Sequence, residues 1–179
     1  MPDPRPRRSA LNRPPQPGEL IQERTDLWIQ RLYGPDRQSD FGGKLGLDLP
    51  EQANRASQDT ALHALWLAPR EWLLVSDADA ARGNLAARIV ANGGALSDLS
   101  HARTVFRIAA GPARNILAQG CPLDLRPAIF LPGHCAQSVL ASVAILVHHL
   151  ADGAHMDIYV ARSYGQYMYD WLNDAAPPT

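Results

Sequence analysis

The chain has 179 residues, of which 46% are hydrophobic, and its 17 basic and 18 acidic residues leave a formal charge of -1 at pH 7. This length suffices for one hydrophobic core, and the balanced charge, with no basic stripe outside the N-terminus, argues against a nucleic acid partner. No apolar run approaches the roughly 20 residues that cross a bilayer, and the first residues lack the apolar segment of a secretory signal, so we expect a cytoplasmic protein without membrane contacts.

Residues 1–19 are predicted to form a disordered tail, because proline fixes φ and removes backbone donors and because the segment offers little to bury. Its arginines could instead contact an acidic surface of a partner. We expect a single domain over residues 20–174 and a second tail at 175–179. The prolines and arginines of the first tail are Pro2, Pro4, Arg5, Pro6, Arg7, Arg8, Arg13, Pro14, Pro15 and Pro17.

Residues 26–33 predict a first strand, and the following residues 34–60 are rich in Gly, Asp, Gln and Asn with little periodicity. We expect a long surface loop there, of the kind that is functional or is ordered by something it touches. Alternating apolar residues then predict a β-hairpin over 61–75, with its turn at Pro69.

A helix is predicted to follow the hairpin. Ser76 or Asp77 can cap its N-terminus, and the pair Gly93 and Gly94 ends it. Its apolar stripe has helical spacing and consists of Ala81, Leu85 and Ile89, widened by Ala86 and Val90.

The second half of the chain predicts five strands, a short helix and a final helix. Gly111-Pro112 opens the short helix, because a backbone N–H in the first turn has no partner within the helix and proline can therefore stand there. A loop over 121–133 follows the helix. Ser163 can cap the final helix. The predicted strands are 95–99, 104–109, 134–140, 142–149 and 155–161; the apolar positions of the final helix are Tyr164, Tyr167, Met168, Trp171 and Leu172.

The order strand, helix, strand, strand, helix, strand over residues 71–140 predicts a split βαβ, ferredoxin-like arrangement. The hairpin strands and the final helix are expected to lie against the same sheet, with the helices packed on one side. The predicted fold class is therefore α+β with a mainly antiparallel sheet.

Candidate metal and phosphate sites are weak. The cluster Gly42-Gly43-Lys44-Leu45-Gly46 fails both phosphate-binding glycine patterns and is interpreted as a flexible loop. Cys121, His134 and Cys135 are soft ligands, but no two of them are spaced to chelate zinc from one element. In a reducing cytoplasm we expect the two cysteines to be free thiols.

Candidate catalytic groups also have simpler interpretations. His148 and His149 should point to opposite faces of a strand, one buried and one exposed. Ser100 and His101 near Asp98 lack the spatial arrangement that activates a nucleophile. The carboxylates Asp98, Asp124 and Asp157 are interpreted as structural, since Asp commonly bonds local backbone N–H groups. We assign no catalytic, cofactor-binding or metal-binding residue to this chain.

Several segments of the chain together resemble one known family. The most specific is Gly120-Cys121-Pro122-Leu123-Asp124-Leu125, and the resemblance extends over about residues 20–172. The other segments are Leu45-Gly46-Leu47-Asp48-Leu49-Pro50, Trp66-Leu67-Ala68-Pro69-Arg70-Glu71-Trp72-Leu73-Leu74, Asp98-Leu99-Ser100-His101 with Gly111-Pro112-Ala113, Arg162-Ser163-Tyr164, and Tyr169-Asp170-Trp171-Leu172. In these segments the sequence resembles the gamma subunit of heterotetrameric sarcosine oxidase.

The resemblance implies an aminomethyltransferase-like fold and a complex that oxidatively demethylates sarcosine to glycine. It also implies that FAD, FMN, NAD, tetrahydrofolate and zinc belong to other subunits and that the gamma subunit is not catalytic. The implied partners are the alpha, beta and delta subunits, mainly alpha. Trp28, Trp66, Trp72 and the aromatic stripe of the final helix are mainly core, but some are expected at an interface.

Two alternatives remain open at this point. One is a stand-alone folate-binding or methylene-transfer protein, which rests on fold analogy alone. The other is the equivalent subunit of a related N-methyl amino acid dehydrogenase, because a small subunit does not report which substrate a distant active site accepts.

Overall fold

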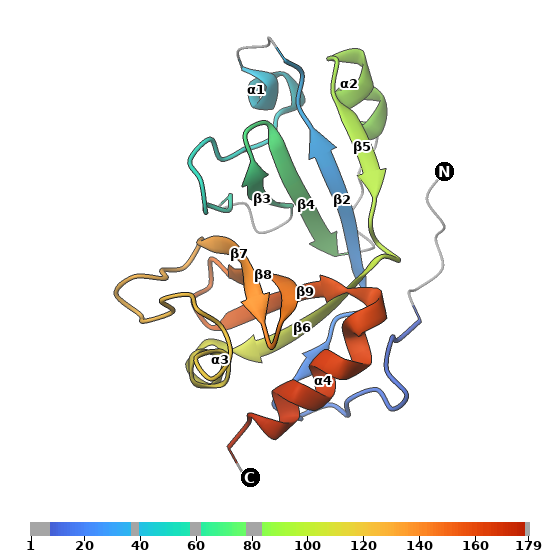
Figure 1. The fold of residues 1–179 in the computed structure, drawn as a ribbon. Coiled ribbons are helices and arrows are strands. Elements are labelled where there is room, and N and C mark those ends of the chain that lie inside the picture. Colours follow the sequence, from blue (N-terminus) through green and yellow to red (C-terminus); the bar gives the residue numbers. More distant parts are fainter. Residues whose placement is uncertain (1–7, 37–39, 58–61, 78–83, 178–179) are drawn as a thin grey trace. The chain divides into compact units, whose positions relative to one another are not determined.

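The computed structural model describes residues 8–36, 40–57, 62–77 and 84–177. These residues form two compact units, one over 26–100 and one made of 8–25 and 101–177. Each unit contains one antiparallel sheet and short helices (Figure 1), which confirms the α+β class. The single sheet predicted from the element order is wrong, because the strands of residues 71–140 are divided between two sheets.

The first unit has a four-stranded sheet in the order β3-β4-β2-β5. Both β4 and β5 pair antiparallel with β2, so they run parallel to each other, and α2 connects them in the chain. This is the predicted split βαβ arrangement, with β2 inserted between the two parallel strands. The strands are β2 (Leu27–Tyr33), β3 (His63–Ala68), β4 (Glu71–Asp77) and β5 (Ala95–Asp98).

The hairpin of β3 and β4 is also confirmed, but neither of the two predicted capping residues begins the helix that follows it. Ser76 and Asp77 still belong to β4, and α2 (Leu85–Ala91) begins after Asn84. Ala81 lies outside the described residues. Leu85 and Ile89 are buried, as predicted. Val90 was predicted to belong to the same apolar stripe, but it is 67% exposed.

A second short helix, α1 (Phe41–Leu45), lies inside the predicted loop of residues 34–60. The Asp40 carboxylate accepts a hydrogen bond from Gly43 N, and Gly46 ends the helix with φ of 59°, a left-handed conformation that glycine adopts readily. Phe41 and Leu45 are buried in one cluster with residues of the sheet and of α2. The glycine cluster therefore builds a helix that closes a core, rather than a flexible loop.

The second unit has a five-stranded antiparallel sheet in the order β1-β6-β9-β8-β7. Four of its strands match the predicted ranges within two residues, and β1 was not predicted. The strands are β1 (Gln22–Glu23), β6 (Arg103–Ala109), β7 (Cys135–Leu140), β8 (Val143–His149) and β9 (His155–Ala161).

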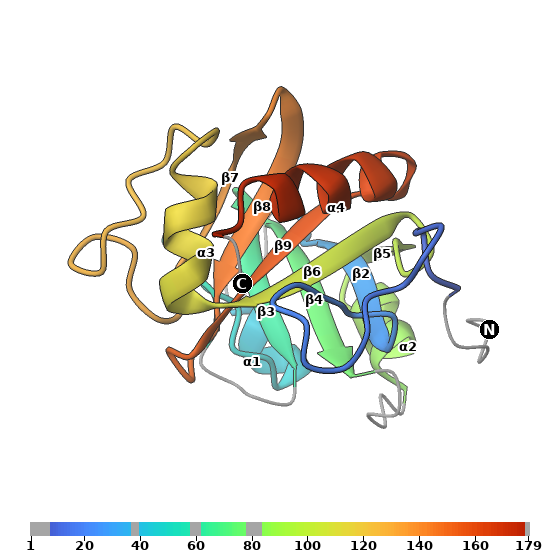
Figure 2. The same ribbon diagram turned by 90° about the horizontal axis from the view of Figure 1, so that it is seen from below.

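Both helices of the second unit pack on one face of its sheet (Figures 1 and 2). They are α3 (Ala110–Leu117) and α4 (Gly165–Asp174). Ser163 lies in a 3-10 turn, η1 (Arg162–Tyr164), and does not cap α4. None of the helices in the described residues is long and apolar enough to cross a bilayer. The side chains at the centre of this core are Phe106, Ile108, Ile116, Leu117, Val147, Met156, Ile158, Val160, Met168 and Leu172.

Part of the predicted N-terminal tail is packed on the second unit. Leu11 is buried in its core, Ala10 N donates to Glu23 Oε1 at 3.0 Å, and Asn12 N donates to Gln166 Oε1 at 2.7 Å. These contacts order residues 9–12 against β1 and α4, while residues 1–7 lie outside the described residues. Leu11 packs in the core of the second unit, although the proline content of the segment predicted disorder.

Candidate functional site

A row of polar side chains crosses the sheet of the second unit on the face opposite α3 and α4. Arg107 and Asp157 are register partners on β6 and β9, and Asp157 is also opposite His148 on β8. His148 in turn is opposite Cys135 on β7. Asp157 is therefore structural, as predicted, but it acts through the side chain of Arg107 rather than through local backbone groups.

Although this row contains a thiol, an imidazole and a carboxylate, Cys135 is completely buried. A nucleophile must be reached by its substrate, and Cys135 has no exposure to solvent. On the same face Tyr159 is also buried, and its hydroxyl has no hydrogen-bond partner among the described residues. Burial and the nearby charge of Asp157 raise the pKa of Tyr159 well above its usual value.

The histidines of β8 differ from the prediction, because both are buried. Their side chains point to opposite faces, as strand geometry requires. His149 is on the helix-covered face, where its ring stacks on Phe130 and its Nδ1 lies 3.1 Å from Phe130 O. A residue 19 positions away in the chain thus covers His149, whereas one of the two histidines was expected to be exposed.

The Ser100 hydroxyl is engaged with the backbone. It accepts a hydrogen bond from Ile29 N at 3.0 Å and lies 3.2 Å from Ile29 O, to which it can donate. Asp98 Oδ1 accepts from Ser100 N at 2.8 Å, which is the local role predicted for Asp98. This geometry joins the end of β5 to β2 through the Ser100 side chain.

Neither Cys121 nor Cys135 forms a disulfide, and both are buried, which confirms the prediction of two thiols. Cys121 Sγ lies 3.6 Å from Ser138 Oγ on the helix-covered face of the sheet, whereas Cys135 faces the other side. Across the described ranges, no three His, Cys, Asp or Glu side chains gather in a way that would hold a metal ion.

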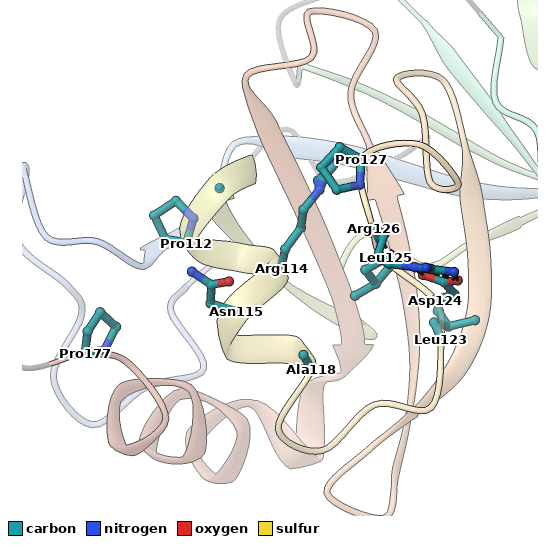
Figure 3. A pocket seen from close by; sticks show the side chains of 11 residues that line it. Pro112, Arg114, Asn115, Ala118, Leu123, Asp124, Leu125, Arg126, Pro127 and Pro177 are labelled. Atoms are coloured by element: carbon teal, nitrogen blue, oxygen red, sulfur yellow. Dashed lines mark hydrogen bonds and ion pairs between the residues drawn. The ribbon is translucent and has the colours of Figure 1, made fainter.

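A candidate binding site is a pocket of about 700 Å³ between α3 and the 121–133 loop (Figure 3). Proline, leucine and alanine side chains make up most of its wall, and Arg114 also lines it. Pockets of this size accommodate a small molecule or several side chains of a partner. The residues around it are Gly111, Pro112, Arg114, Asn115, Ala118, Leu123, Asp124, Leu125, Arg126, Pro127 and Pro177.

The Asp124–Arg126 pair at the rim is self-contained. Arg126 Nε donates to Asp124 Oδ1 at 2.9 Å and Arg126 NH2 donates to Oδ2 at 2.6 Å. The hydrogen bonds from the Arg126 side chain and backbone lower the pKa of Asp124 to about 2. Asp124 also accepts from Arg126 N at 3.2 Å, so its predicted role in local backbone bonding is confirmed.

Arg114 differs from Arg126 because no carboxylate neutralises it within the described residues. Its NH2 donates to Phe130 O at 3.1 Å, while its Nε and NH1 are buried without an acceptor in that part of the chain. Figure 3 shows the side chain reaching from α3 toward Pro127. Arg114 was not predicted, because its only local signal is a cation on a short helix before a proline-rich loop.

The first unit carries a smaller pocket of about 490 Å³. Trp66, Trp72 and Phe41 contribute aromatic walls, and Asp48 and Glu51 contribute negative charge. Trp72 Nε1 donates to Pro50 O at 2.8 Å, which fixes the ring in the wall. The two pockets offer binding surfaces, and neither brings together a nucleophile with a base.

Comparisons with known proteins point to one family. A family model described as "Sarcosine oxidase, gamma subunit family" matches residues 38–177. A curated relative from Arthrobacter sp, "Sarcosine oxidase subunit gamma", is 26% identical over 155 residues, covering 84% of this chain and 75% of the relative.

Two solved structures share the fold. One is the heterotetrameric sarcosine oxidase of Corynebacterium sp. U-96 in complex with pyrrole 2-carboxylate, with a TM-score of 0.74 and 24% identity over 87% of this chain and 82% of that chain. The other is the glycine cleavage system aminomethyltransferase T of Bartonella henselae, with a TM-score of 0.56 and 13% identity over 85% of this chain and 44% of that chain. The aminomethyltransferase-like fold is thereby confirmed.

Proposed function

Because the chain belongs to the sarcosine oxidase gamma subunit family, we propose that it is the non-catalytic gamma subunit of a heterotetrameric sarcosine oxidase. Its role is structural: it binds and braces the alpha subunit within a complex that also contains beta and delta chains. The observation that carries this proposal is the family match over residues 38–177. The fold shared with a chain of a solved heterotetrameric sarcosine oxidase supports it.

The complex is proposed to demethylate sarcosine oxidatively to glycine, with hydrogen peroxide as one product. The one-carbon unit leaves as formaldehyde, or as 5,10-methylenetetrahydrofolate when tetrahydrofolate accepts it. FAD, FMN, NAD, tetrahydrofolate and zinc are assigned to the other subunits, and the complex is assigned to the cytoplasm. The buried Cys135, the backbone-bonded Ser100 and the paired Asp157 fit a chain that contributes no reacting group.

The proposal is tested by expressing a tagged form of this chain together with the alpha, beta and delta chains of the same host. We expect one species that contains all four chains and consumes oxygen when sarcosine is added. Four chains that elute separately would contradict the assignment. Leaving this chain out should lower the yield or the melting temperature of the remaining complex, since bracing is its proposed role.

Two further assays separate the alternatives. Titrating the isolated chain with tetrahydrofolate should give no saturable binding; tight binding would favour a stand-alone folate protein. Comparing sarcosine, dimethylglycine and N-methylglutamate as substrates of the four-chain complex distinguishes a sarcosine oxidase from a related N-methyl amino acid dehydrogenase.

A further inference from the structure

The 121–133 loop is held rigidly although it has no regular secondary structure. Leu125 and Phe130 are buried in the core of the second unit, and the backbone N–H groups of Ile129 and Phe130 both donate to Arg126 O at 2.9 Å. At its end, Gly133 N donates to His149 O at 2.9 Å. A loop fixed in this way pays little conformational entropy when it binds a partner.

This loop displays two large aliphatic side chains to solvent. Ile129 is 51% exposed and Leu131 is 45% exposed. They flank Phe130 in the sequence. The Phe130 side chain is buried, whereas those of its two neighbours are exposed. A single exposed aliphatic residue is ordinary, but two of them on a rigid loop beside an apolar pocket are typical of a binding surface.

Residues 123–127 of the same loop line the pocket, and Arg114 in the pocket wall donates to Phe130 O, between Ile129 and Leu131. Pro112, Leu123, Leu125 and Pro127 provide carbon surface around Arg114. Arginine is always charged, and a buried guanidinium N–H without an acceptor is unfavourable. Nε and NH1 of Arg114 are buried, but the charge of its guanidinium is neutralised by no carboxylate within the described residues, and an occupant that brings a carboxylate would complement this charge.

The N-terminus of α3 lies at the same wall, where Gly111 and Pro112 form part of the lining. The positive end of a helix dipole favours an anion in its vicinity. An added Cβ on Gly111 would meet no atom within 4 Å, so this part of the wall is open. The helix end alone would not define a site, but it adds to the charge of Arg114.

We propose that the pocket together with Ile129 and Leu131, here called the docking surface, receives an extended segment of a partner subunit. The segment carries aliphatic or aromatic side chains beside an Asp or Glu, whose carboxylate accepts hydrogen bonds from Arg114. A small organic acid would satisfy Arg114 but leave Ile129 and Leu131 in water, whereas a polypeptide segment covers all three. This inference rests on the proposed function and adds to it the surface and the chemistry of assembly.

A competition experiment tests the docking surface in the complete complex. Wild-type chain and a variant, each with its own tag, are co-expressed with the alpha, beta and delta chains, and their ratio in the purified complex is measured. The Ile129→Asp, Leu131→Asp double variant should be depleted by about 30-fold, as for loss of a strong contact at an interface. Arg114→Gln should be depleted by about 10-fold, because the partner carboxylate loses its cation.

The matched control is Val90→Asp, an equally drastic change at an exposed aliphatic residue on α2 in the other unit. It should enter the complex as often as the wild type. Circular dichroism and melting of each isolated variant establish that it folds. If Arg114→Gln is unstable, the Ile129→Asp, Leu131→Asp double variant still tests the proposal. Both side chains are exposed in the isolated chain, so replacing them should not unfold it.

A photo-reactive amino acid at position 131 identifies the occupant. We expect its cross-link to a partner peptide that contains Asp or Glu among apolar residues, and a cross-linked peptide without an acidic residue would overturn the proposal. It would also be overturned if both docking variants assembled like the wild type, or if only Arg114→Gln were depleted, which would indicate a small anion. A dimer of the isolated chain that the double variant dissolves would overturn it in favour of a second copy. If the wild-type chain itself fails to enter the complex, the proposed function fails first.

Discussion

Arg107 and Asp157 face each other across the ladder of β6 and β9, and both carboxylate oxygens accept hydrogen bonds at 2.7 Å, one from Nε and one from NH2. The Asp157 side chain is 3% exposed and that of Arg107 is 26% exposed. This bidentate pair is therefore largely shielded from water, unlike the Asp124–Arg126 pair at the pocket rim.

Breaking the buried pair should destabilise the fold. Asp157→Asn leaves the guanidinium of Arg107 without its counterion, and we expect the free energy of unfolding to fall by about 3 kcal/mol. Urea denaturation of the two proteins measures the difference. Asp124→Asn is the matched control: its ion pair is exposed, so the midpoint should hardly move. Equal effects of the two variants would mean that the Arg107–Asp157 pair is not shielded from water.

Tyr159 should make the protein less stable at alkaline pH. Its pKa is raised well above 10.0 by burial and by the charge of Asp157, so the folded state keeps the hydroxyl neutral while the unfolded state ionises it near 10. The contribution to stability is complete below pH 10 and is lost as the pH rises above it. Free energies of unfolding measured from neutral pH upward should fall less steeply in Tyr159→Phe. An identical slope would show that Tyr159 ionises normally in the folded protein.

The ionisation of Asp124 should be measurable at acidic pH. Its folded-state pKa is about 2 against an ordinary 3.8, so its contribution to stability, which is small because the ion pair is exposed, is present above 3.8 and is lost as the pH falls toward 2. Carboxyl carbon NMR should record this low midpoint directly. In Arg126→Met the midpoint should return toward 3.8, because the side-chain hydrogen bonds to Asp124 are gone. A midpoint that stays near 2 would assign the shift to the backbone instead.

Two glycines should respond differently to alanine. At Gly94 a Cβ would lie 2.6 Å from Phe41 Cζ and 2.9 Å from Tyr33 O, so we expect Gly94→Ala to cost roughly 1–3 kcal/mol through overpacking. At Gly111, in the first turn of α3, a Cβ meets nothing within 4 Å apart from its chain neighbours, and alanine should cost less than at Gly94, because only the restriction that Pro112 places on the preceding residue opposes it. Thermal melts of both variants check the contrast; a stable Gly94→Ala would contradict the close packing of α1 on β2.

Local periodicity was sufficient to place most strands and the two helices of the second unit. The strand predicted over 155–161 is β9, whose alternating Met156, Ile158 and Val160 lie in one core, and Gly111-Pro112 located α3 within two residues. Ends of elements were less predictable. Ser76 and Ser163 both have capping side chains, yet one continues β4 and the other lies in η1, because neighbouring strands and turns, not the cap residue alone, decided where each helix began.

The candidate site depended more on tertiary contacts than the elements did. His149 is buried because Phe130 stacks on it, and Arg114 lines a pocket because the 121–133 loop returns to α3. Leu11 joins the core of the second unit although its neighbours resemble a mobile tail. None of these contacts has a signature in sequence spacing, since each joins residues that are far apart in the chain.

The sequence by itself determined the α+β class, the positions of the strands and the resemblance to one family, because alternation, turn residues and motifs are local properties of the chain. Only the tertiary structure decided that the strands form two sheets, that β2 lies between β4 and β5, and that Arg107 meets Asp157. Backbone hydrogen bonds between strands are the same for every residue type, so the choice of partner strand is made by how side chains from distant segments pack together.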